Sequence, residues 1–270
     1  MRSYKTLIIG GHIRSGTTLL WRICNTHPDI KLTYEFNNFS ALGKPYKKYI
    51  KSILHRVWLR GLFSYNVLNN NNSNLNLIQK IKKSVNNNVF IMKYLYNVIK
   101  RRTVVKSDHI GSYLHKIFND KIIVGDKYPH YLFLLDKYPE LENLLVLIVY
   151  RDCRDVVSST LKKVRTDWKN QKWTYEYDTA EKVAKKWVES INIMESHRNN
   201  IHIVRYENLM NNSVDEISSI GEYLGVRFPS NLTDNVDTSS IGKYKTYLSE
   251  EEIQSIMRVA GPVLSRLEYI

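Results

Sequence analysis

The chain has 270 residues, of which 43% are hydrophobic, 11% aromatic and 24% charged. These proportions are typical of a soluble globular protein, and they exclude a collagenous, coiled-coil or wholly disordered chain. Lys and Arg number 40 against 26 Asp and Glu, so the formal net charge is +14. A domain this basic usually meets an anionic partner, such as nucleic acid, phosphate, an acidic glycan or a membrane surface.

The excess positive charge lies in one internal segment. Residues 36–107 hold 14 Lys or Arg and no Asp or Glu, whereas the rest of the chain holds 26 residues of each sign. The framework outside this segment is therefore formally neutral. Because the chain also carries no recognisable RNA-binding or DNA-binding motif, we expect no nucleic acid partner.

The two cysteines, Cys24 and Cys153, have neither the spacing of a disulfide framework nor the neighbouring ligands of a zinc site. No apolar run approaches the roughly 20 residues of a membrane span, and the run after Lys5 is too short for a secretory leader. We therefore predict a cytoplasmic protein without a bound metal, in which any contact with a membrane is peripheral.

In chain order, the first predicted elements are a strand from Lys5 to Ile9, a glycine-containing turn and a helix from about 15 to 25. Another helix is predicted from Pro45 to Phe63, because apolar residues recur at helical spacing with Lys and Arg on the other faces. This basic helix either packs its apolar face on the core or lies on an anionic membrane surface. Further helices are predicted near 75–86, 90–101 and 108–118.

The second half of the chain alternates strands with helices. Strands are predicted at 121–124, 144–149 and 201–204, and helices near 130–137, 153–164, 179–197, 213–224 and 250–267. Such alternation indicates parallel βαβ units. The sequence therefore predicts an α/β fold with a P-loop-like parallel sheet flanked by helices. We expect one domain over 1–270, with a basic, mostly helical insertion at about 37–118.

A candidate anion-binding loop follows the first strand. Residues 11–16 have the Gly-x4-Gly frame of a phosphate loop, whose backbone N–H groups and following helix favour an anion. Nucleotide triphosphatases continue with Lys and then Ser or Thr, but here Thr17 and Thr18 follow, and the cation of the loop is Arg14. The pattern indicates an anion cradle without the magnesium-triphosphate apparatus; the alternative is an ordinary tight turn with an N-cap serine.

The run Gly-x-x-Arg-Ser-Gly-Thr-Thr-Leu-Leu, which begins at Gly11, resembles the 5′-phosphosulfate loop of sulfotransferases. These enzymes transfer a sulfuryl group from 3′-phosphoadenosine 5′-phosphosulfate (PAPS) and release 3′,5′-diphosphoadenosine (PAP), and the resemblance implies no metal. It also implies that the 5′-phosphosulfate is held by Arg14, Ser15, Gly16, Thr17 and Thr18.

A second motif follows the strand at 144–149. A guanidinium at a strand end and a hydroxyl in the first turns of the next helix can hold one phosphate together with the helix N-terminus. Arg151 and Ser159 have this arrangement, and the segment resembles the 3′-phosphate motif of sulfotransferases. Taken alone, Arg151 could equally be a solvated arginine or one paired with an aspartate.

Two later segments extend the resemblance. Residues 204–209 are similar to the Arg-Tyr-Glu-Asp-Leu segment of the family, which implies that Tyr206 lies near the adenosine. Residues 239–244 resemble the late segment that closes over the cofactor, which implies a cofactor contact for Lys243. Tyr244 stands there where tryptophan is usual.

The resemblance also implies the catalytic residues. Bacterial and tyrosylprotein-sulfotransferase-like members carry a Glu behind a His-Pro pair, and Glu35 occupies that place as the candidate general base. Lys127 stands in a segment similar to the Lys-Thr-Pro segment of the family and is expected to stabilise the transferring sulfuryl group together with Arg14. The alternatives are a surface or salt-bridged Glu35 and a turn lysine at 127, with Asp126 as its ion-pair partner.

The sequence therefore predicts a PAPS-dependent sulfotransferase that acts on a hydroxyl acceptor. The basic segment suggests an acidic glycan, a peptide or a lipid as that acceptor. Aromatic and basic residues at 165–177 suggest an acceptor-side loop, or else a loop that docks on the body. The rival hypotheses are a P-loop small-molecule kinase and a non-catalytic protein that binds an anionic membrane or nucleic acid.

Overall fold

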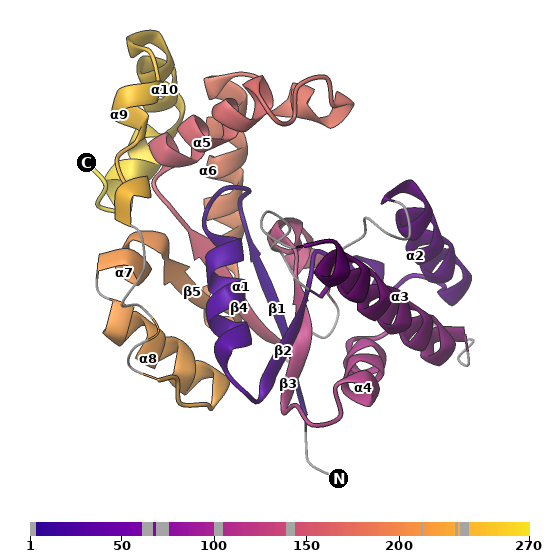
Figure 1. The fold of residues 1–270 in the computed structure, drawn as a ribbon. Coiled ribbons are helices and arrows are strands. Elements are labelled where there is room, and N and C mark those ends of the chain that lie inside the picture. Colours follow the sequence, from indigo (N-terminus) through magenta and orange to yellow (C-terminus); the bar gives the residue numbers. More distant parts are fainter. Residues whose placement is uncertain are drawn as a thin grey trace. The chain divides into compact units, whose positions relative to one another are not determined.

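The computed structural model describes residues 4–60, 67–68, 76–99, 105–138, 144–211, 213–229, 232 and 238–270 (Figure 1). Over these residues the strands form one five-stranded sheet in the order β2-β3-β1-β4-β5. The pairs β1 with β3, β2 with β3, and β4 with β5 are parallel. The predicted α/β fold, a parallel sheet flanked by helices, is confirmed. The strands are β1 (Lys5–Gly11), β2 (Ile30–Tyr34), β3 (Ile123–Lys127), β4 (Leu145–Tyr150) and β5 (His202–Arg205).

Four of these strands were expected, and β2 was not. The strands β1 and β4 are continuous apolar runs that are buried along most of their length, as parallel strands covered on both faces require. In β2 the lysine and threonine of Ile-Lys-Leu-Thr-Tyr interrupt the apolar pattern over only five residues. β2 lies at the edge of the sheet, where it pairs with β3 alone. A strand this short gives little periodic signal.

The helices follow the predicted order with two corrections. The stretch predicted as helices at 75–86 and 90–101 is one helix, α3, which continues through three consecutive asparagines at 86–88. Asparagine lowers helix propensity only modestly, and the buried Asn87 side chain accepts a hydrogen bond from the backbone of Leu68. The segment expected as a helix at 130–137 is a 3₁₀ helix, Pro129–Lys137. Residues 61–63, 75 and 100–101 of the predicted helices lie outside the described part of the chain.

The α-helices are α1 (Thr17–Thr26), α2 (Tyr46–Arg60), α3 (Leu77–Ile99), α4 (Ser107–Ile117), α5 (Cys153–Arg165), α6 (Ala180–Ser196), α7 (Tyr206–Asn211), α8 (Ser213–Leu224), α9 (Tyr244–Tyr247) and α10 (Glu250–Arg266). None of the helices in the described ranges combines the length and the apolar character needed to cross a bilayer.

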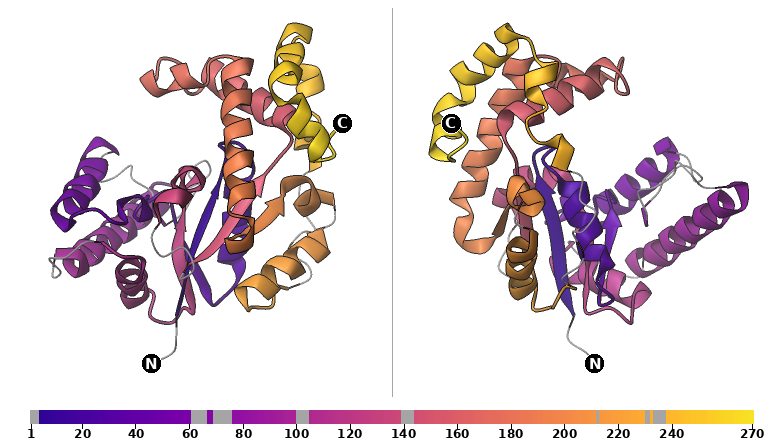
Figure 2. Two further views of the ribbon diagram at one scale, coloured as in Figure 1. Left: turned by 180° about the vertical axis from the view of Figure 1, so that it is seen from behind. Right: turned by 60° about the vertical axis from the view of Figure 1, so that its left-hand side comes forward.

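The chain divides into two compact units, which we describe separately. The first unit comprises residues 1–9 and 18–146, and the second comprises residues 10–17 and 147–270. In the second unit α6 packs against α5 and α10, and Figure 2 shows α6 beside α10 in both views. The single domain over 1–270 with an insertion at about 37–118 stays a prediction.

In the first unit an aromatic cluster joins α2, α3 and α4. Tyr49 of α2 and Tyr94 of α3 are fully buried and hydrogen-bond through their hydroxyls. The ring of Tyr94 also contacts Phe36 at 4.9 Å and Tyr113 of α4 at 5.8 Å, measured between ring centroids. The apolar face of α2 therefore packs on the core, which is the first of the two alternatives given for this helix.

Gly125 allows β3 to approach β1. It lies opposite Leu7, and a Cβ atom at position 125 would stand 1.7 Å from the Leu7 carbonyl oxygen. Gly125→Ala must therefore move the strands apart and should lower the free energy of unfolding by more than about 3 kcal/mol, measured by urea denaturation. Gly261→Ala in α10 is the matched control, because its nearest neighbour is Met257 Cε at 3.9 Å. The control should be unchanged or more stable by about 0.5–1 kcal/mol. Equal stability of the two variants would contradict the strand pairing.

Candidate active site

The loop between β1 and α1 is a tight turn with a buried hydroxyl that has no partner among the described residues. The backbone of Arg14 is left-handed, with φ of 66°, and Gly16 has φ of 102°. The Ser15 backbone N–H donates to the carbonyl of His12 at 3.2 Å, which closes the turn. The Ser15 hydroxyl is buried and has no hydrogen-bond partner among the described residues. A buried hydroxyl in a turn that leads into a helix N-terminus fits an anionic ligand.

Tyr206 joins this loop to the rest of the second unit. A Cβ atom on Gly16 would stand 2.4 Å from Tyr206 Cδ2, so the loop can approach the ring only through a glycine. The Tyr206 hydroxyl lies 2.6 Å from Ser240 Oγ, and the Arg151 guanidinium carbon lies 4.5 Å from the centroid of the ring. The ring therefore brings the loop, the strand-end arginine and residues 238–240 together.

Arg151 is a buried cation with a donor still available. Its side chain lies 3.4 Å from Asp155 Oδ2, and its Nη2 donates to the carbonyl of Ser240. The Nε atom is buried without a hydrogen-bond partner in the described part of the chain. The Trp187 indole donates to the backbone carbonyl of Arg151 at 2.9 Å and so holds the residue in place. Leaving a guanidinium donor unpaired in a buried site is unfavourable, and a bound phosphate would satisfy it.

The structure brings the two predicted phosphate motifs together in the second unit. Arg14 Nε donates to Ser159 Oγ of α5 at 2.9 Å. Thr17, at the start of α1, is buried in the same unit. The loop cation therefore reaches the hydroxyl that the sequence assigned to the other phosphate.

Lys243 lies in a segment that Asp155 anchors to α5. The backbone N–H groups of Gly242 and Tyr244 donate to the two carboxylate oxygens of Asp155 at 2.8 and 3.1 Å. The Lys243 side chain itself is exposed. The sequence left open an aspartate partner for Arg151 without naming it, and Asp155, near the start of α5, is that partner.

In the first unit the candidate base and the candidate lysine form an ion pair. Lys127 Nζ lies 2.7 Å from Glu35 Oε1 and 3.3 Å from Thr18 Oγ1. It also lies 3.8 Å from the centroid of the Tyr34 ring, which is a cation–π contact. The Lys127 side chain is fully buried, whereas that of Glu35 is 28% exposed. The carboxylate is thus the accessible member of the pair.

Asp126 holds the turn that presents Glu35, and the ion pair of Lys127 is with Glu35 rather than with Asp126, the alternative partner. Glu35 and Asn37 both have left-handed backbones, with φ of 50° and 57°. The Asp126 carboxylate accepts hydrogen bonds from the backbone N–H groups of Phe36 at 3.2 Å and Asn37 at 2.7 Å. It also accepts hydrogen bonds from the side-chain hydroxyls of Thr33 at 2.6 Å and Tyr131. A left-handed pair of non-glycine residues is unfavourable alone, and these bonds offset its cost.

His12 is a buried loop residue that sequence reasoning did not assign. Its Nδ1 lies 2.8 Å from the Ile13 carbonyl, and its Nε2 is buried with no hydrogen-bond partner in the described ranges. Burial lowers the pKa of His12 to about 4, with a smaller contribution from the charge of Lys186, so the imidazole is neutral at pH 7. Its ring packs edge-on against Tyr177, with 6.2 Å between the centroids.

The aromatic segment at 165–177 was interpreted either as an acceptor-side loop or as a loop that docks on the body, and the structure shows features of both. Tyr177 packs on the loop through His12, as the docking alternative requires. Trp173 and Tyr175 are exposed by 47% and 69%, which leaves apolar surface on this segment. Within the ranges that the structure describes, no group of three or more His, Cys, Asp or Glu side chains could hold a metal ion.

The described residues form an α/β protein with a P-loop-like turn after β1 and, in the first unit, an ion pair between Glu35 and Lys127. A family model described as the sulfotransferase family matches residues 6–230, so the chain belongs to that family. None of the curated proteins compared with the chain matches it.

Two solved structures share the fold. The chain is 17% identical to the sulfotransferase domain from the Synechococcus PCC 7002 olefin synthase, with a TM-score of 0.55 and coverage of 96% of both chains. It is 15% identical to the sulfotransferase domain from the curacin biosynthetic pathway, with a TM-score of 0.54 and coverage of 97% of both chains. At these identities the likeness extends to the fold alone.

The Asp126 carboxylate should make stability depend on pH. Burial raises the pKa of the Asp126 carboxyl to about 6. The four hydrogen bonds that it accepts lower this pKa, but their effect is smaller than that of burial. The unfolded value is about 3.9. Between these values the folded state binds more protons than the unfolded state, so the free energy of unfolding should fall as the pH rises from about 4 to 6.

In the wild type, the fall in the free energy of unfolding between about pH 4 and 6 should stay below about 3 kcal/mol. In Asp126→Asn this fall should be absent. Urea denaturation across the pH range measures it. Thr33→Val removes a donor that favours the charged carboxylate and should move the fall to higher pH. Parallel pH profiles for the wild type and Asp126→Asn would contradict this assignment.

Proposed function

We propose that the protein is a PAPS-dependent sulfotransferase that moves a sulfuryl group to a hydroxyl acceptor. Family membership supports sulfuryl transfer in general. The observation that carries the choice of donor is the pair of buried polar atoms, Ser15 Oγ and Arg151 Nε, that have no partners among the described residues and lie in the two phosphate motifs. PAPS offers two phosphate groups that would satisfy them.

Different residues are proposed to hold the 3′-phosphate, the adenosine and the 5′-phosphosulfate of PAPS. When bound, PAPS supplies an activated sulfuryl group with a phosphate leaving group. Arg151 and Ser159 would hold the 3′-phosphate, and Tyr206 would lie near the adenosine. Lys243 would contact the cofactor from the segment that Asp155 anchors. The 5′-phosphosulfate would be held by the loop residues Arg14, Ser15, Gly16, Thr17 and Thr18.

The proposed chemistry is an in-line transfer. The acceptor oxygen forms a bond to sulfur while the bond from sulfur to the phosphate oxygen breaks, and PAP leaves. Glu35 takes the proton of the acceptor hydroxyl, and its partial exposure makes it reachable for that purpose. Lys127 and Arg14 stabilise the negative charge on the sulfuryl and leaving phosphate oxygens. No step in this scheme uses a metal.

The acceptor is proposed at the level of a hydroxyl compound. The acid-free segment from 36 to 107 favours an acceptor that is itself acidic, which includes glycans, peptides and lipids. The kinase alternative has no support in the loop, because Thr17 stands where a nucleotide triphosphatase has lysine. Magnesium-dependent turnover of ATP by the wild type would support the kinase alternative.

Glu35→Gln tests the general base. We expect turnover of PAPS to fall by at least about 100-fold, because general-base catalysis contributes that much or more. Binding of PAP, measured by calorimetry, should stay within about twofold, since Glu35 is assigned no cofactor contact. Asp120→Asn, an exposed carboxylate in the same unit, is the matched control and should leave turnover unchanged. Full activity of Glu35→Gln would remove Glu35 from the mechanism.

Arg151→Ala tests the 3′-phosphate site. A charge-assisted bond from a buried arginine to phosphate contributes about 1.5–3 kcal/mol, so PAP should bind roughly 10-fold to 100-fold more weakly in calorimetry. Arg165→Ala at the end of α5, where the arginine is 47% exposed and pairs with Glu252, is the control and should bind PAP normally. Circular dichroism shows whether each variant is folded. Unchanged affinity of folded Arg151→Ala would mean that the motif is misassigned.

A further inference from the structure

The helix α3 carries apolar residues on two opposed faces. Phe90, Ile91, Tyr94 and Val98 are buried against the first unit. A second set recurs every three or four positions on the other side of the helix, which places it on one stripe. This set, which we call the α3 stripe, consists of Ile81, Val85, Val89, Met92, Tyr96 and Ile99.

The α3 stripe is open to solvent along the helix. Its six side chains are between 43% and 69% exposed, and Met92 is the most exposed of them. At 1.5 Å per residue, the distance from Ile81 to Ile99 is about 27 Å. Scattered exposed apolar residues need no explanation, but a continuous row of this length marks an interaction surface.

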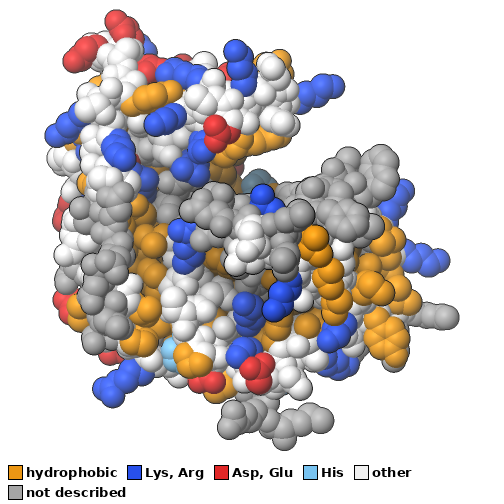
Figure 3. Space-filling model, in the orientation of Figure 1, with side chains coloured by type: hydrophobic (Ala, Val, Ile, Leu, Met, Phe, Trp, Pro, Cys, Tyr) orange, Lys and Arg blue, Asp and Glu red, His pale blue; other side chains and the backbone are white. Residues whose placement is uncertain are grey.

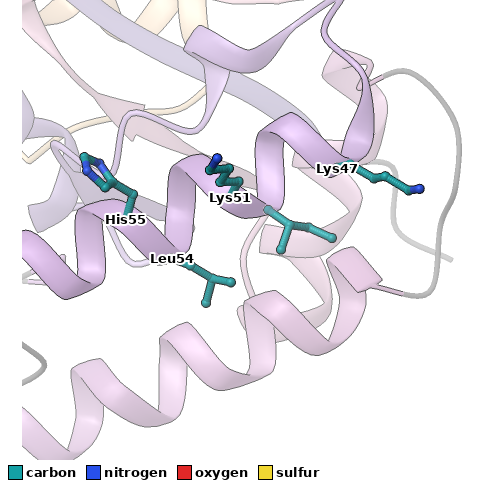
Figure 4. A pocket seen from close by; sticks show the side chains of 5 residues that line it. Lys47, Lys51, Leu54 and His55 are labelled. Carbon is teal, nitrogen blue, oxygen red and sulfur yellow. The ribbon is translucent and has the colours of Figure 1, made fainter.

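Lysines and a neighbouring helix border the stripe. Lys82 and Lys93 are exposed on α3. On α2, Leu54 is 51% exposed and lines an open groove with Lys47 and Lys51. Figure 4 shows these α2 side chains on successive turns of the helix, and Figure 3 shows hydrophobic and basic side chains side by side over α2 and α3. The surface therefore combines apolar side chains with positive charge.

The partner of this surface must be both apolar and anionic. The acid-free segment from 36 to 107 contributes ten Lys and four Arg, which include Lys100, Arg101 and Arg102 directly after α3 in the sequence. A second copy of the same chain would bring like charges together. Protein interfaces are depleted in lysine, whereas helices that lie in the surface of a bilayer carry lysine beside their apolar side chains.

We propose that the α3 stripe, with its flanking lysines, docks on an anionic lipid surface. The apolar side chains enter the boundary between headgroups and acyl chains, and the ammonium groups stay with the anionic headgroups. This surface differs from the face of α2 that carries Tyr46, Tyr49 and Ile53, which is buried. The inference does not depend on the proposed sulfotransferase chemistry, because it concerns only where the first unit binds.

Vesicle flotation with the full chain tests the proposal. The wild type should float with phosphatidylcholine vesicles that contain about one third phosphatidylserine, and not with phosphatidylcholine alone. The double variant Val85→Asn and Met92→Gln loses two inserting side chains and should bind at least about tenfold more weakly. Lys82→Gln with Lys93→Gln should also bind more weakly, and the remaining binding should depend less on salt than that of the wild type, because fewer charges are left to screen.

Val214→Asn is the matched control, because Val214 of α8 is 59% exposed, close to the 53% of Val85, and lies in the second unit. It should float as the wild type does. Failure of the wild type to bind the anionic vesicles would overturn the proposal. Equal loss of binding in Val214→Asn and in the double variant Val85→Asn with Met92→Gln would also overturn it. A concentration-dependent dimer that sedimentation detects only while the stripe is intact, in a chain that does not bind vesicles, would assign the stripe to a second copy instead.

Discussion

The buried ammonium of Lys127 is the constraint on which the candidate site depends. A lysine without solvent contact is costly unless its charge is paired and hydrogen-bonded. Glu35 supplies the opposite charge, Thr18 supplies an acceptor and the Tyr34 ring supplies a face. Glu35 reaches Lys127 from a left-handed turn, and Asp126 holds this turn by accepting hydrogen bonds from two backbone N–H groups. The fixed position of the candidate base is therefore a consequence of burying the lysine beside it.

In the second unit the corresponding constraint is close packing around Tyr206. The loop needs a glycine at position 16 because the ring occupies the space of a side chain. The same ring also takes part in an electrostatic contact, because the Arg151 guanidinium lies over it. The charge of Arg151 is only partly neutralised by Asp155, which lies 3.4 Å away. The chain passes between the two units at Thr17 and Thr18, so the residues of the predicted phosphosulfate loop belong to both units.

The sequence predicted what local pattern encodes. Continuous apolar runs identified β1, β3, β4 and β5, and the glycine frame identified the loop. It did not predict β2, whose signal is short and mixed, or the role of Asp126, which depends on a turn 90 residues away in the chain. The burial of His12 was equally invisible, because it comes from tertiary packing rather than from its neighbours in sequence. Contacts between distant segments have no local signal, so such residues are found only in the fold.

The distribution of charge separates the framework from the basic segment. In the framework, cations are paired with specific acids, as Arg151 is with Asp155 and Arg154 with Asp152. Between residues 36 and 107 no acid exists, so its 14 cations have no carboxylate within the segment to pair with. Repulsion among them opposes folding of α2 and α3, and the aromatic cluster around Tyr94 offsets it. A segment that retains both this repulsion and an exposed apolar row is better adapted to an external anionic surface than to solvent alone.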